Sequence, residues 1–143
     1  MKQLKGFTLI ELIIVIALIG ILATFVVANF LGVKQRARDT QRKSDLRQVQ
    51  SAFELYRTDV GTYPASLPAC GAALTSGTNT YMQKFPCDPS SASAYGYTIA
   101  GSVYYLRACL ENANDSQKDS VQNNPNPPSA CAASTVSFTV TNP

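Results

Sequence analysis

The sequence predicts an α+β fold in which a long N-terminal helix, with a protruding apolar half and a packed amphipathic half, carries a small antiparallel sheet of about three strands. Three observations predict this fold. Residues 7–33 are almost entirely apolar, which is typical of a helix that is covered on all sides. Residues 34–60 lack Gly and Pro and carry an apolar stripe along one helical face. Beyond residue 94, three short segments are rich in β-branched and aromatic residues, as strands are.

The first six residues have the composition of a removable leader, because they are short, basic at Lys2 and Lys5, and end in the small residue Gly6. Cleavage after Gly6 would give Phe7 a new α-amino group about one helical turn from Glu11. Glu11 is the only charged residue in the apolar run. A carboxylate in such surroundings is costly unless it is paired. We therefore expect this amine, on the same chain or on a neighbour, to neutralise it.

The start of the apolar run also carries a family signature. Residues 5–11 have the sequence KGFTLIE, and together with the long apolar segment they resemble the class III leader of type IV pilins and type II secretion pseudopilins. The resemblance implies that a membrane-embedded prepilin peptidase cleaves after Gly6 and N-methylates Phe7. It also implies that Glu11 recruits and registers each incoming subunit.

Two simpler interpretations of the N-terminal segment are a secretory signal peptide and a plain single-span membrane anchor. The apolar run is too long for a signal peptide, and residues 23–29 show no clear A-x-A-like cleavage site. A plain anchor explains the hydrophobicity but gives no reason for Glu11 or for the Gly6–Phe7 junction. We therefore favour a filament subunit.

The helix is predicted to run nearly continuously from Phe7 to about Asp59 and to end at the Gly61 to Pro64 segment. Its apolar stripe recurs at spacings of three and four residues. The residues of the stripe are Leu46, Val49, Phe53, Tyr56 and Val60. The resemblance implies that residues 7–33 cross the membrane in the precursor and form the filament core, whereas residues 34–60 pack against the head domain.

Basic residues are concentrated at the start of the amphipathic half. One interpretation is a DNA-binding stripe, because clustered cations attract phosphates and related filaments serve in DNA uptake. No aromatic residue alternates with these charges to stack on bases, so we favour a solvated helix face that pairs with acids of adjacent subunits. The basic residues are Lys34, Arg36, Arg38, Arg42, Lys43 and Arg47, and the acids among them are Asp39 and Asp45.

The head domain is predicted to span residues 61–143. Residues 63–94 are expected to be a loop because they contain several prolines and a Gly/Ser/Thr-rich stretch. The predicted strands are residues 95–100, 103–110 and 135–141. Gly101 and Ser102 join the first two strands as a type II′ turn.

Four cysteines at positions 70, 87, 109 and 131 follow the apolar run. An even number of dispersed cysteines in an exported domain predicts two disulfides. Their spacings match no familiar zinc pattern. Three connectivities are possible, and we favour Cys70–Cys87 with Cys109–Cys131, because the second pair brackets a long polar connection.

That connection contains Asn112, Asp115 and Asp119. The major pseudopilins, which the chain resembles, bind calcium near this region. The spacing does not fit a carboxylate-rich calcium loop, so we expect a solvated turn, no metal site and no cofactor.

The chain has no His, no phosphate loop and no nucleophile motif, so we predict no catalytic residues and no enzyme activity. We expect a pilin-like subunit that polymerises through its N-terminal helix into a cell-surface filament. Its expected partners are prepilin peptidase, an inner-membrane assembly platform and an ATPase motor. The alternative is a major pseudopilin of a type II secretion or DNA-uptake system, which forms a short periplasmic pseudopilus. Ala28 stands where pili often have a helix-disrupting proline, which favours the alternative slightly.

Overall fold

The described residues of the computed structural model are 6–120, 131 and 135–143, without the side chains of residues 26–29 and 31. Of the predicted leader, only Gly6 lies within the described residues. The chain divides into two compact units, residues 1–34 and residues 35–143.

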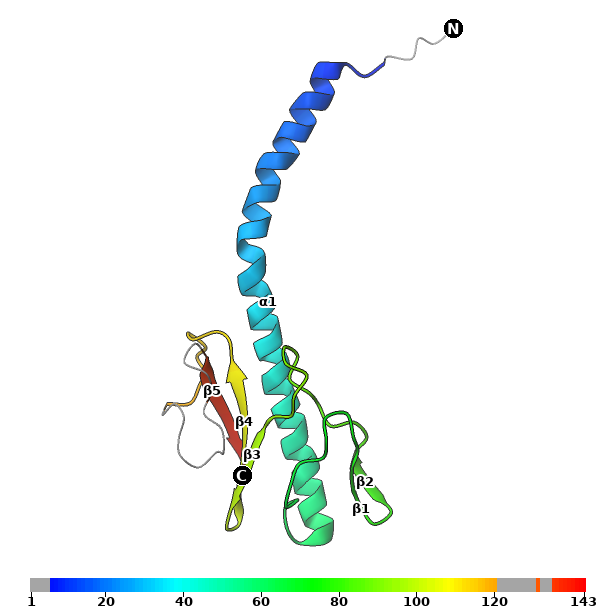
Figure 1. The fold of residues 1–143 in the computed structure, drawn as a ribbon, viewed down its shortest axis with the longest axis vertical. Helices are drawn as coiled ribbons and strands as arrows, with labels where there is room; N and C mark the ends of the chain where they lie inside the picture. Colours follow the sequence, from blue (N-terminus) through cyan, green and yellow to red (C-terminus); the bar gives the residue numbers. More distant parts are fainter. Residues whose placement is uncertain (1–5, 121–130, 132–134) are drawn as a thin grey trace. The chain divides into compact units, whose positions relative to one another are not determined.

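Helix α1 (Leu9–Val60) runs through both units (Figure 1). Its bounds lie within two residues of the predicted ones. Gly61 ends it by adopting a left-handed backbone with φ of 84°, and its N–H donates to the carbonyl of Arg57 at 2.8 Å. This is the usual glycine cap of a helix C-terminus, because glycine reaches positive φ at little cost.

The part of α1 in the first unit consists almost entirely of apolar residues, with Glu11 as the only charged residue between Leu9 and Val33. Its described large apolar side chains are exposed in the single chain, with exposed fractions that range from 46% for Val15 to 76% for Leu9. So large an exposed apolar surface requires another apolar surface to cover it. Among the described residues no helix is both long enough and apolar enough to cross a membrane. The span predicted for residues 7–33 includes side chains outside the described set, so it stays a prediction.

The second unit contains a three-stranded antiparallel sheet of order β3-β4-β5. Its strands are β3 (Gly96–Ala100), β4 (Val103–Leu110) and β5 (Val136–Thr141). Each lies within one residue of a predicted strand, so the α+β fold expected from the sequence is confirmed. Gly101, with φ of 63°, forms the predicted turn between β3 and β4.

The core of the head lies between this sheet and the apolar stripe of α1. Alternate residues of β4 are buried and contribute to one cluster with the stripe. The cluster includes Tyr104, Leu106, Ala108 and Leu110 from the strand and Leu46, Val49 and Phe53 from the helix. The rings of Phe53 and Tyr104 meet edge to face at 5.2 Å, a favourable geometry for aromatic pairs.

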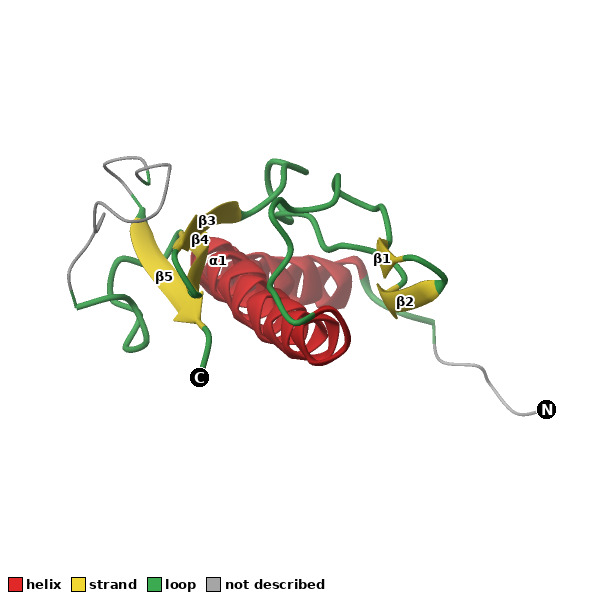
Figure 2. Cartoon of the chain, turned by 90° about the horizontal axis from the view of Figure 1, so that it is seen from below, coloured by secondary structure: helices red, strands yellow, loops and turns green. Residues whose placement is uncertain are grey.

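The segment 63–94, expected to be loop throughout, contains a second sheet. Strands β1 (Leu74–Ser76) and β2 (Asn79–Met82) form an antiparallel hairpin, and it lies on the other side of α1 from β3–β5 (Figure 2). Gly77, with φ of 58°, makes the turn. Strands of three and four residues are too short for a clear alternating pattern, and only Leu74 of the hairpin strands is fully buried. The prediction of a loop was therefore wrong for these residues.

Candidate functional site

The first candidate site is the start of α1, where Thr8 and Glu11 form a capping box. The Thr8 N–H and hydroxyl both donate to Glu11 Oε2, at 2.9 and 2.8 Å, and the Glu11 N–H donates back to Thr8 Oγ1 at 3.3 Å. This reciprocal arrangement satisfies backbone donors that the first turn of a helix leaves without partners. Glu11 therefore has a partner within its own chain.

Thr8 is a residue of this candidate site that the sequence prediction missed. The signal was available, because a threonine followed three residues later by a glutamate, just before an apolar run, is the usual sequence pattern of a capping box. Gly6 and Phe7 precede the helix in non-helical backbone, and Phe7 is 84% exposed. The peptide bond between them is therefore accessible, as a processing site has to be. Its cleavage stays a prediction.

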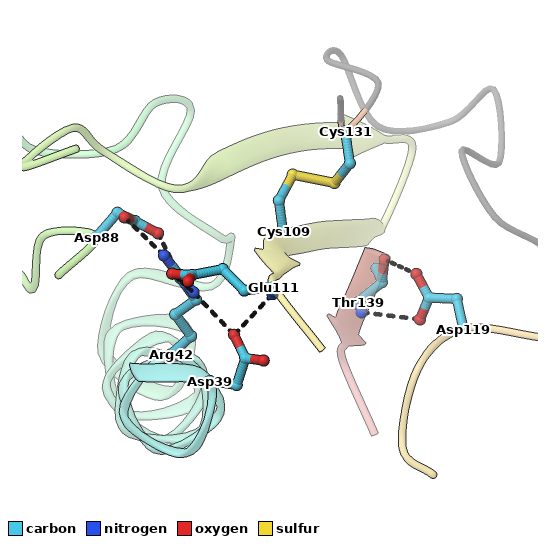
Figure 3. Close-up of a disulfide and its surroundings, with 8 residues drawn as sticks. All are labelled: Asp39, Arg42, Asp88, Cys109, Glu111, Asp119, Cys131 and Thr139. Atoms are coloured by element: carbon cyan, nitrogen blue, oxygen red, sulfur yellow. Dashed lines mark hydrogen bonds and ion pairs between the residues drawn. A yellow bond between two sulfur atoms is a disulfide. The ribbon is translucent and has the colours of Figure 1, made fainter. Parts of the chain in front are cut away.

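The second candidate site is a buried ion cluster in the head, centred on Arg42, which is 3% exposed. All five N–H donors of its guanidinium are used. Nε and Nη2 donate to Asp88 at 2.6 and 3.1 Å, Nη2 also donates to Ser90 at 2.8 Å, and Nη1 donates to Asp39 and Glu111 at 2.8 and 2.9 Å. A planar fork of donors suits several carboxylates at once. The Arg42 cluster thus joins α1 to the segment before β3 and to the end of β4 (Figure 3).

The carboxylates of the Arg42 cluster have further donors. Asp39 accepts the backbone N–H groups of Glu111 and Asn112 at 2.9 and 2.8 Å. Glu111 is also paired with Arg38, whose Nε lies 2.7 Å from Oε1. Buried charges are tolerated only when paired and hydrogen-bonded in this way.

These contacts lower the pKa values of two acids. The hydrogen bond from Arg38, joined by those from Ser90 and Arg42, lowers the pKa of Glu111 to about 2 against the effect of burial. Burial alone would raise the pKa of Asp88, but hydrogen bonds from Arg42 and from the N–H groups of Ser90 and Ser91 outweigh it and lower the pKa to about 2. Both groups are therefore fully ionised at neutral pH.

The expectation of a solvated basic face is wrong for half of the basic residues. Arg38 and Arg42 pair with acids of their own head, and Lys43 Nζ lies 2.8 Å from Asp115 Oδ2. Among the described residues, Lys34, Arg36 and Arg47 form no ion pair and are exposed. Arg42 is consequently not available to bind a phosphate.

A sequence signal for the buried charges existed. Stepping back from Leu46 along the apolar stripe by four and then three residues leads to Arg42 and Asp39, so both lie on the face that packs against the head. The prediction placed them on a solvated face because of their charge alone. Their partners could not be identified from local spacing, since Asp88 is 46 residues from Arg42 in sequence.

Two disulfides join Cys70 to Cys87 and Cys109 to Cys131, with Cα–Cα distances of 5.3 and 5.5 Å. These are the two pairings favoured from the sequence. The second disulfide lies beside the end of β4, near the Arg42 cluster (Figure 3).

The candidate calcium ligands of the polar connection are all occupied by protein donors. Asp115 accepts from Lys43 and from the N–H of Gln117, both at 2.8 Å. Asp119 accepts from the N–H and hydroxyl of Thr139 at 2.9 and 2.7 Å. The side-chain oxygen of Asn112 accepts the N–H of Asn114 at 3.1 Å. A calcium ion needs six to eight oxygens, so this donor set does not fit one, and the described residues contain no acidic or cysteine cluster suited to a metal.

Comparison with known proteins agrees with the N-terminal signature. Residues 1–27 match the prokaryotic N-terminal methylation motif, and residues 29–123 match protein G of the type II secretion system. The resemblance to the pilin and pseudopilin family is thereby confirmed. No solved structure gives a significant match.

Curated relatives carry the name type II secretion system core protein G. The protein from Vibrio cholerae is 34% identical over 98 residues, which cover 62% of this chain and 67% of that protein. The protein from Pseudomonas aeruginosa is 30% identical over 111 residues, which cover 71% and 78%. The chain spans about two thirds of the length of the curated relatives it matches. Because the protein G match covers more than half of the chain, the chain belongs to the type II secretion system protein G family of major pseudopilins, which are structural proteins and not enzymes.

Proposed function

We propose that the mature chain is a major pseudopilin subunit that polymerises into a periplasmic pseudopilus of a type II secretion system. The protein G match and the curated relatives support this function over the cell-surface pilus that the sequence alone favoured. The single structural observation that carries it is the apolar N-terminal part of α1, whose large described side chains are exposed in the single chain. In the precursor this surface would be covered by lipid, and in the pseudopilus by neighbouring copies.

Processing by a prepilin peptidase would precede assembly. The match of residues 1–27 to the methylation motif supports it, as does the accessible, non-helical backbone at Gly6 and Phe7. The precursor would reside in the inner membrane, and a motor and assembly platform would supply the energy for extraction. These partners follow from the family and not from any contact in the chain.

Glu11 is proposed as the registration residue. Both hydrogen bonds that it accepts from Thr8 go to Oε2, so Oε1 can accept the α-amino group of a neighbouring Phe7 without breaking the cap. A carboxylate that keeps its own helix start in place and still offers one oxygen is suited to pairing a new subunit with the preceding one. The pairing would be strong because the surrounding surface is apolar.

The experiment is deletion of the gene in its native host, followed by complementation with the wild-type chain. Loss of exoprotein secretion upon deletion, with restoration by the wild-type chain, is the expected result. N-terminal sequencing of the assembled material should start at a methylated Phe7, and electron microscopy should find no long surface fibres at native expression. Assembly of a chain that retains its first six residues would refute the registration mechanism, and normal secretion in the deletion strain would refute the function.

A further inference from the structure

Residues 111–135 connect β4 to β5, and within the described ones, 111–120, 131 and 135, three attachments to the head lie outside the Arg42 cluster. Lys43 on α1 pairs with Asp115, Asp119 binds β5, and Cys131 is joined to Cys109 on β4. Each attachment is made by the protein's own groups, and all of these residues are described.

The attachment at Asp119 occupies the outer edge of the sheet. The Asp119 N–H donates to the carbonyl of Ser137 at 2.8 Å. The Asp119 carboxylate accepts the N–H and hydroxyl of Thr139 at 2.9 and 2.7 Å. The Ser137 carbonyl and the Thr139 N–H are backbone groups that β5 would otherwise present to a further strand, since β5 pairs with β4 on its other edge. Asp119 therefore fixes the connection and covers part of an exposed strand edge.

The attachment at Asp115 contains a cation of the chain itself. Lys43 Nζ lies 2.8 Å from Asp115 Oδ2, and the two side chains are only 16% and 12% exposed. This hydrogen bond lowers the pKa of Asp115. An ammonium ion here neutralises one of the two carboxylates that the described part of the connection would offer to a divalent cation, and the remaining oxygens of Asp115 and Asp119 already accept hydrogen bonds.

We propose that Lys43, Asp119 and the Cys109–Cys131 disulfide fasten the β4–β5 connection in place of a metal ion, so that the head is stable without calcium. Calcium sites hold loops because one ion binds several oxygens. In this head the connection is held instead by the Lys43 ammonium, by the Asp119 carboxylate at the sheet edge and by the Cys109–Cys131 disulfide. The disulfide closes a loop of 22 residues, a size for which cross-linking is strongly stabilising.

The test uses the full chain in detergent micelles and two measurements. Near-ultraviolet circular dichroism of the seven tyrosines follows melting of the head. Trypsin cleavage after Lys118, which is exposed within the connection, follows its attachment. We expect the melting temperature of the wild-type chain to be unchanged by chelator or by about 1 mM calcium, a concentration that fills extracellular-type sites.

Replacing Cys109 and Cys131 together by serine should lower the melting temperature by about 10 °C or more and accelerate cleavage after Lys118. The matched control replaces Cys70 and Cys87, which close a loop of 17 residues elsewhere in the head. It should also lower the melting temperature but leave cleavage after Lys118 at the wild-type rate.

Lys43→Gln should accelerate the same cleavage, whereas Lys84→Gln, at an exposed position of the head, should not. A rise of several degrees in the wild-type melting temperature with calcium would overturn the proposal. So would a wild-type cleavage rate in both the Lys43 variant and the Cys109/Cys131 variant. If the cysteine variant does not fold, the calcium measurement on the wild-type chain and the Lys43 variant still decide. None of these readouts depends on secretion or assembly, so failure here is distinct from failure of the proposed function.

Discussion

Replacing Arg42 by methionine removes the guanidinium that holds three carboxylates together while keeping an unbranched apolar stem. Asp39, Asp88 and Glu111 would then lie close together with their negative charges largely uncompensated. Removing one member of a buried ion pair costs about 3–5 kcal/mol. The lower value applies, because Glu111 keeps its bond to Arg38 and the Asp88 and Glu111 side chains are 14% and 20% exposed, which lets water reach them.

A loss of about 3 kcal/mol corresponds to a fall in melting temperature of about 12 °C for a domain of roughly a hundred residues. The assay is thermal unfolding of the full chain in detergent, followed by tyrosine near-ultraviolet circular dichroism, because the apolar half of α1 would mask head unfolding in the far ultraviolet. Arg42→Lys should fall between the wild type and Arg42→Met, since one ammonium cannot replace a fork of five donors.

The matched control is Arg47→Met, which makes the same chemical change at an exposed position of the same helix. It should alter the melting temperature by no more than about 2 °C, as surface substitutions usually do. A loss below about 1 kcal/mol for Arg42→Met, or wild-type stability for Arg42→Lys, would refute the view that this cluster anchors the helix to the head.

Three further predictions concern single features of the chain. Glu11→Gln should leave the helix start and head stability intact, because glutamine can complete a capping box, but should abolish pseudopilus formation in the native host, scored by electron microscopy and secretion. The head should lose on the order of 3 kcal/mol between about pH 5 and pH 2, because the pKa values of Asp88 and Glu111 are lowered to about 2 and their stabilisation disappears as they protonate. Gly61→Ala should cost about 1 kcal/mol in thermal unfolding, since alanine disfavours the left-handed backbone that caps α1.

Each of these has a contrary outcome. Normal fibres from Glu11→Gln would show that the charge is not used in assembly. In the acid transition, Asp45 acts in the opposite direction, because burial raises its pKa. Its protonation stabilises the folded head as the pH falls, which makes the total loss of stability smaller. The Arg42→Met variant should nevertheless show a flatter pH profile than the wild type, and an identical profile would contradict the assignment. Unchanged stability of Gly61→Ala would mean that the helix end tolerates a different cap, since no neighbouring atom lies within 4 Å of the new methyl group.

Elements whose pattern is long and regular could be predicted from the sequence. Helix α1 and strands β3–β5 lie within one or two residues of the expected bounds, because an unbroken apolar stripe and alternating strands report directly on which face is buried. The β1–β2 hairpin could not be found in this way. Its strands are short and mostly exposed, so burial imposes almost no pattern on them.

The Arg42 cluster shows a different limit of sequence reasoning. Periodicity alone places Asp39 and Arg42 on the buried face, but their charge argues for solvent, and the conflict is resolved only by Asp88 and Glu111, which are far away in sequence. A buried charge is tolerated only when it is paired, so the burial of Asp39 and Arg42 can be predicted only once their partners are known. The burial of a charged residue that continues an apolar stripe can therefore be assigned only from the three-dimensional structure.

The carboxylates of the Arg42 cluster and the carboxylate of Glu11 differ in how completely their own chain satisfies them. This difference distinguishes a site that stabilises the fold from one suited to assembly. In the head, Asp39, Asp88 and Glu111 each accept hydrogen bonds from their own chain on both carboxylate oxygens. At the start of α1, Thr8 binds only one oxygen of Glu11, within a surface that is apolar and exposed in the single chain. Glu11 keeps one carboxylate oxygen without a hydrogen bond from the described residues and lies on the surface proposed to contact another copy, so Glu11, and not the head cluster, is expected to control polymerisation.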